Sequence, residues 1–176
     1  MDLGPVDRIT ADAIGEPGSR TFYLQARSGG DVVTVIVEKQ QVQLLAASVL
    51  ELLEEIVTEE DVVSDPTMAL EEPFDPRWRA GRLSLAFDDD RDLFLLEIEE
   101  FRPDPEDLDP DDPRSLLSGE EAETIRVWAS AAQMLSLSRH GAAVAAMGRP
   151  TCQFCGNPID PEGHTCPAMN GHSRPA

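Results

Sequence analysis

The spacing of the apolar residues changes at Lys39, and this change limits the folds open to the chain. Before it, Thr21–Arg27 alternates between apolar and polar side chains, and Val32–Glu38 is β-branched and mostly apolar. These patterns are typical of a half-buried strand and of a central strand, and a weaker alternation predicts a strand over Val6–Ile14. After it, apolar residues recur at three- and four-residue steps, which predicts an amphipathic helix over Lys39–Val57.

The second half of the chain repeats this order of elements. Alternation predicts strands over Leu83–Phe87, Leu93–Glu99 and Thr124–Ala129, and the apolar spacing that follows predicts a helix over Ser130–Met147. Prolines punctuate Thr58–Arg79, so this segment is predicted to be a linker between the halves.

Three strands followed by a helix, twice, predict an α+β fold built from a duplicated βββα unit. Because an apolar sheet face must be covered, we expect one antiparallel sheet, or two, with both helices packed on it. The predicted domain covers residues 1–148, with repeat halves of about 1–60 and 80–148, and residues 149–176 form a small C-terminal tail. The alternative to a true duplication is a chance echo of element order within one α+β domain.

All three cysteines of the chain lie in this tail. Cys152 and Cys155 are two residues apart, so both thiolates can face one metal ion from a single turn, and Gly156 suits the left-handed position of such a turn. His164 and Cys166 follow them. Three thiolates and one imidazole are typical of a closed structural zinc site, whereas an odd number of cysteines argues against a disulfide framework.

The expected cofactor is therefore Zn²⁺, and its fourth ligand has two candidates. His164 is the first, and His172, further along the tail, is the alternative. The tail has little apolar content, so we expect its folding to depend on the metal, whose binding is worth roughly 10–16 kcal/mol in small zinc peptides.

Net charge limits the kind of partner. The chain has 34 acidic and 14 basic residues, a formal charge of −20. A chain this acidic repels DNA and RNA, whose binding depends on cations that neutralise phosphates; its charge serves solubility or suits a basic protein surface.

No apolar run approaches the ~20 residues of a membrane span, and the N-terminus lacks the features of a signal peptide. We therefore expect a cytoplasmic protein, no membrane contact and a protein partner.

One set of polar residues near the first predicted helix is a candidate site for a small anion. These side chains could converge at one end of the sheet, beside a helix N-terminus, where an anion is favoured. The alternative is a solvated sheet face with a capping turn. The set is Arg20, Tyr23, Gln25, Arg27, Lys39 and Gln40.

Three motifs carry a resemblance to a known family. They are Cys152-x-x-Cys155-Gly156 with Gly163-His164-x-Cys166-Pro167, Gly15-Glu16-Pro17-Gly18-x-Arg20, and Glu38-Lys39-Gln40-Gln41-Val42. The chain is similar in these to domain of unknown function 3090, an uncharacterised family of bacterial repeat proteins. The resemblance implies a cytoplasmic bacterial protein with a metal-binding tail, and it implies no reaction. Gln153 stands where proline is expected, and Ala168 where arginine is expected, which removes a contact for an anion or for the body of the protein.

These observations leave two expectations for function. The first is a protein-interaction or adaptor module with a structural zinc. The alternative is an enzyme or sensor that binds a small anionic ligand near Arg20–Gln41. No arrangement of residues typical of catalysis stands out, so the sequence leaves open whether the protein is an enzyme, and it leaves its oligomeric state open as well.

Overall fold

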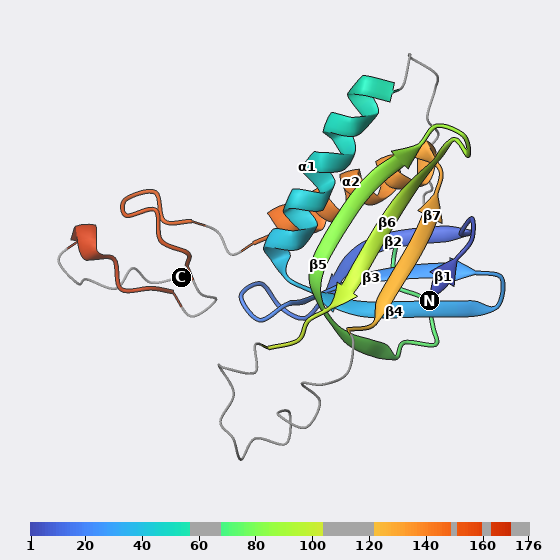
Figure 1. Ribbon diagram of the computed structural model, residues 1–176. Helices are drawn as coiled ribbons and strands as arrows, with labels where there is room; N and C mark the ends of the chain where they lie inside the picture. The colour runs from blue at the N-terminus through green and yellow to red at the C-terminus, as the bar shows by residue number, and fades with distance from the viewer. Residues whose placement is uncertain (57–67, 104–121, 149–150, 160–162, 170–176) are drawn as a thin grey trace.

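The computed structural model of the protein describes residues 1–56, 68–103, 122–148, 151–159 and 163–169. Within them the fold is mixed α+β, with two helices and a seven-stranded sheet (Figure 1). The strands are β1 (Asp2–Leu3), β2 (Arg8–Ile14), β3 (Thr21–Ser28), β4 (Asp31–Val37), β5 (Pro76–Asp88), β6 (Leu93–Glu100) and β7 (Thr124–Ala129). The helices are α1 (Lys39–Ile56) and α2 (Ala131–Ala146), and a 3-10 helix, η3 (Pro167–Met169), lies in the tail.

The sheet joins two antiparallel meanders, β2–β3–β4 and β5–β6–β7, in the order β1-β7-β6-β5-β4-β3-β2. The meanders meet at a parallel pair, β4–β5, and β1 also pairs in parallel with β7. The prediction of a wholly antiparallel sheet is therefore wrong at these two pairs. The reason at the first is α1, because a helical crossover lets the next strand run in the same direction as the last.

Apolar side chains from both meanders bury against one another. In Figure 1, β2–β4 run across the direction of β5–β7, so the sheet is strongly bent. The chain just before β2 reaches the end of β7, where the N–H of Val6 donates to the carbonyl of Trp128 over 2.9 Å. Residues from both meanders line a void of about 10 Å³ in this core, among them Ile9, Leu24, Val35, Ile98, Ile125 and Val127.

The two helices pack against each other and against the sheet. α2 contacts β2 and α1, and α1 also contacts β5 and β3. The helices approach closely at Gly141, where a Cβ atom would lie 3.0 Å from Cγ1 of Val42 and 3.3 Å from Cβ of Ala11. Nearby, the buried hydroxyl of Ser138 donates to the carbonyl of Ala46 over 2.8 Å. Glycine at this position is therefore what allows α2 to lie so close to α1 and β2.

Residues 68–74 cover the polar face of β2–β4. The hydroxyl of Thr10 donates to the carbonyl of Met68 over 2.6 Å. The side-chain amide of Gln25 donates to the carbonyl of Glu71 over 3.0 Å and accepts from its N–H over 2.7 Å. Gln25 and Thr34, which also share a hydrogen bond, are 2% and 1% exposed. This face of the sheet is a buried polar interface.

The structure differs from the sequence-based expectation in two further respects. The end of the predicted linker is part of the sheet, since β5 begins at Pro76; proline is tolerated as the first residue of a strand. Three strands followed by a helix do occur twice in order, but the helices are placed differently, with α2 lying on β2 of the other meander. The arrangement does not establish a duplication. None of the described helices is long and apolar enough to cross a membrane.

Candidate metal centre and neighbouring cavity

A tight turn in the tail presents two of the cysteines. The N–H of Gly156 donates to the carbonyl of Cys152 over 2.9 Å, and the N–H of Cys152 donates to the carbonyl of Asn157 over 2.8 Å. Gly156 has a φ of 72°, which favours glycine. An isolated antiparallel bridge between Thr151 and Pro158 closes the base of the turn. The Cys-x-x-Cys-Gly sequence therefore folds as its spacing predicts.

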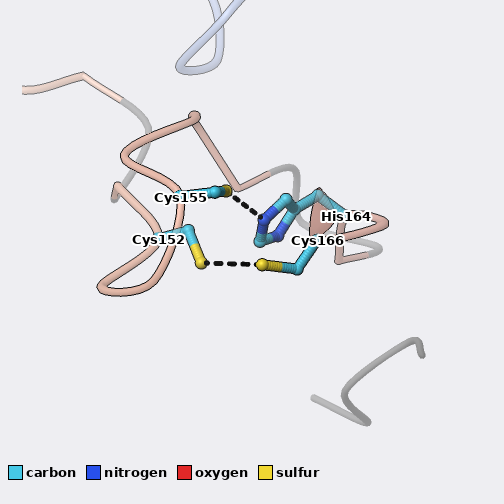
Figure 2. Close-up of side chains that lie close together, drawn as sticks. All are labelled: Cys152, Cys155, His164 and Cys166. Atoms are coloured by element: carbon cyan, nitrogen blue, oxygen red, sulfur yellow. Dashed lines mark hydrogen bonds between the residues drawn. The ribbon is translucent and has the colours of Figure 1, made fainter. Parts of the chain in front are cut away.

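Four side chains from two stretches of the tail point toward one another (Figure 2). The ligand atoms of Cys152, Cys155, His164 and Cys166 all lie within 4.8 Å of one another. The sulfurs of Cys152 and Cys166 are 3.8 Å apart, and the sulfur of Cys155 is 3.3 Å from Nε2 of His164. All four predicted ligands are thus brought together, while the alternative, His172, lies outside the described residues.

The Cys152–Cys166 and Cys155–His164 separations fit a tetrahedral ion. With Zn–S bonds of ~2.3 Å and a Zn–N bond of ~2.0 Å, tetrahedral geometry places two sulfurs about 3.8 Å apart and a sulfur and a nitrogen about 3.5 Å apart. A disulfide would need its two sulfurs at about 2.05 Å, so the contact between Cys152 and Cys166 is not one. The four donors are therefore positioned to bind a metal ion.

The surroundings of Cys152 favour its thiolate, the form that binds metal. The backbone N–H groups of Cys155 and Phe154 hydrogen-bond its sulfur and, against the effect of burial, lower the pKa of Cys152 from 9.0 to about 6. For Cys155, a hydrogen bond from the N–H of Asn157 lowers the pKa, but burial and the neighbouring Cys152 and Cys166 outweigh it, so the pKa is raised. A cation among the donors would relieve this crowding of negative charge.

A cavity of about 520 Å³ lies beside the tail, and the turn that carries Cys152 and Cys155 forms part of its wall. Thr151 and Pro158, the two residues of the bridge, line it from the tail. Across from them are the chain before β3, the last strand residues of β4, the start of α1 and the end of α2. The cavity thus lies where one end of the sheet, both helices and the tail meet.

Two of the six candidate anion-binding residues line this cavity. Arg20 does so from the segment before β3, where its Nη1 donates to the carbonyl of Val144 in α2 over 3.3 Å. Lys39 does so from the first turn of α1, and its Nζ would lie 3.8 Å from a Cβ atom placed on Gly148. The structure therefore brings these two cations to one site.

The other four candidates lie elsewhere. Tyr23 stacks edge-on against Phe74, with ring centroids 4.9 Å apart, and Arg27 pairs with Glu71, Nε to carboxylate oxygen 3.1 Å. Gln25 is buried under the same segment, and Gln40 is exposed on α1 and does not line the cavity. The side chains of Tyr23, Gln25 and Arg27 share the polar face of β3 that residues 68–74 cover.

Sequence reasoning missed a third cation of the cavity. Arg79 lines it from β5 and forms an ion pair with Glu38, which lines it as well. Arg79 ends the predicted linker, Thr58–Arg79, which prolines such as Pro76 punctuate. The available signal was the alternation of Arg77, Trp78, Arg79 and Ala80, which reads exposed, half-buried, exposed and buried.

Comparison with known proteins gives a family and no activity. No curated protein and no solved structure matches the chain. A family model described as "Protein of unknown function (DUF3090)" matches residues 1–166. This range is nearly the whole chain, and it includes the three clustered cysteines and His164. The protein therefore belongs to this family of unknown function, DUF3090.

Proposed function

We propose that Cys152, Cys155, His164 and Cys166 bind one zinc ion, and that the ion has a structural role. The observation that carries the proposal is the mutual approach of the four ligand atoms, all within 4.8 Å. Thiolates are soft ligands that select zinc over hard cations such as magnesium and calcium. Four protein ligands fill a tetrahedral shell and leave no position for the water that a catalytic zinc needs.

The zinc would order a segment that has little else to hold it. Among the described tail residues, only Cys152 and Cys166 are buried, and both are ligands. Such a segment cannot offset its loss of conformational freedom by apolar burial, so metal binding supplies the stabilisation.

Reduced thiols of this kind favour a cytoplasmic location. The repeated order of strands and helices also favours an origin by internal duplication.

We propose further that the zinc-ordered turn contacts a partner protein, as an adaptor would. Phe154 lies between Cys152 and Cys155, and its N–H donates to the sulfur of Cys152 over 3.4 Å. The residue is 58% exposed. Aromatic residues are enriched at protein interfaces. The charge of −20 favours a partner with a basic surface.

Elemental analysis of the purified, untagged protein tests the metal. We expect one zinc per chain, and none in Cys155→Ser, while the far-ultraviolet circular dichroism of the sheet and helices stays close to that of the wild type. A metal other than zinc, or a metal-free wild type purified without chelators, would contradict the proposal.

The adaptor role needs a separate measurement. A basic protein captured by the wild type should be lost with Phe154→Ala, a variant that keeps its zinc. Phe101→Ala is the matched control, because Phe101 is 54% exposed but lies after β6, outside the tail. If both substitutions weaken capture equally, the turn is not the contact surface.

A further inference from the structure

The cavity beside the tail has a charge opposite to that of the whole chain. Among the residues that the structure describes, three cations line it, Arg20, Lys39 and Arg79, against one carboxylate, Glu38. Its lining therefore has a net charge of about two positive units in a protein of charge −20. A concave site with a local positive charge concentrates anions near it.

The three cations come from different elements and hold different partners. Arg79 is engaged by Glu38, and Arg20 donates to a backbone carbonyl at the end of α2. Lys39 forms no ion pair within the part of the chain that the structure describes. Its ammonium group stays available to a ligand. Arg20 uses one N–H in its 3.3 Å hydrogen bond to the carbonyl of Val144, and its guanidinium has further N–H donors that a ligand can accept from.

The size of the cavity and the backbone around it suit a small molecule. A volume of about 520 Å³ falls within the roughly 300–1,000 Å³ typical of ligand sites. Lys39 begins α1, whose first turn contains no acidic residue, so the N–H groups at this helix end add to the attraction for an anion.

We propose that this cavity binds a small organic anion, with Lys39 and Arg20 holding its phosphate or carboxylate group. The inference goes beyond the proposed zinc function, because it concerns a second site made mainly by the sheet and helices. Thr151 and Pro158 close that site from the tail.

Titration calorimetry on the zinc-loaded full chain tests it, with glycerol 3-phosphate and succinate as probes at constant ionic strength. Neither probe competes strongly for zinc. We expect saturable binding of at least one probe. Selective binding of glycerol 3-phosphate would assign the site to phosphates, and selective binding of succinate would assign it to carboxylates.

Variants separate the cavity from general charge effects. Lys39→Gln should weaken binding roughly tenfold, the loss expected for one charge-assisted contact. Arg126→Gln is the matched control, since it removes one positive charge from an exposed position that pairs with Glu97 outside the cavity, and it should leave affinity unchanged. The proposal is overturned if the wild type shows no saturable binding of either probe, or if the two variants weaken it equally.

Discussion

The sulfur of Cys155 lies 3.3 Å from Nε2 of His164, which places this histidine, rather than a more distant one, among the clustered cysteines. Replacing it with alanine should reduce zinc affinity by at least tenfold, because even second-shell partners of a metal typically account for about 10–100-fold. His172→Ala should keep wild-type affinity. Competition with a chromophoric chelator measures both variants, and the reverse order of effects would assign the ligand to His172.

Zinc binding should weaken further once the pH falls below about 6. Hydrogen bonds from the N–H groups of Cys155 and Phe154 hold the pKa of Cys152 at about 6, below the ordinary 9.0. Folding lowers this pKa, so the ionised thiolate of Cys152 stabilises the folded, metal-free tail. This stabilisation is complete above pH 9 and is lost as the pH falls through 6. Below that point protons compete with zinc for the sulfur.

Competition with a chromophoric chelator at pH 8, 7, 6 and 5 measures the zinc affinity. Fluorescence of Trp78 and Trp128, which lie in β5 and β7, reports whether the sheet stays folded. A zinc affinity at pH 5 equal to that at pH 8, in a protein that stays folded, would contradict the assignment of Cys152 as a ligand.

Gln25 should matter for stability and not for ligand binding. Gln25→Met keeps the volume of the side chain but leaves the buried N–H of Glu71 and the hydroxyl of Thr34 without their partner, which costs about 1–3 kcal/mol. Gln40→Met, on the exposed side of α1, should change the free energy of unfolding by less than about 0.5 kcal/mol. Urea denaturation compares the two, and equal effects would show that the polar face of β3 is not sealed.

Gly141→Ala should destabilise the protein although alanine favours helices. The gain in helix propensity is about 1 kcal/mol, whereas overpacking against Val42 and Ala11 costs about 1–3 kcal/mol. Val42→Ala should relieve part of the cost in the double variant. Gly30→Ala, where a Cβ atom meets nothing within 4 Å, is the control and should be near neutral. A more stable Gly141→Ala would mean that the helices separate without cost.

Local patterns predict the elements of this fold well because most of them are amphipathic. The apolar steps after Lys39 predict α1 to within one residue at its end, and β7 matches its predicted range, Thr124–Ala129. The clustering of Cys152, Cys155, His164 and Cys166 is also predictable, since residue type and spacing in the tail are typical of a metal site.

Long-range contacts explain what the sequence did not reveal. Strict alternation places Gln25 on the polar face of β3, and that is correct, but only the return of residues 68–71 makes that face buried. β1 has two residues and no periodicity of its own, and it exists because it pairs with β7. Arg79 reaches the cavity because β5 lies beside β4. This pairing depends on the crossover through α1, which no local pattern in the sequence of β5 reveals.

Removal of zinc should weaken anion binding without abolishing it. Cys152 and the turn it anchors hold Thr151 and Pro158 at the cavity wall, whereas the cations lie outside the tail, Arg20 just before β3 and Lys39 at the start of α1. Disordering the turn therefore opens one side of the site and leaves its charges in place. We expect the Kd for the bound probe to rise severalfold in Cys155→Ser, less than the roughly tenfold expected for Lys39→Gln. Titration calorimetry on both variants checks this order, and an affinity in Cys155→Ser equal to that of the wild type would show that the tail contributes nothing to the cavity.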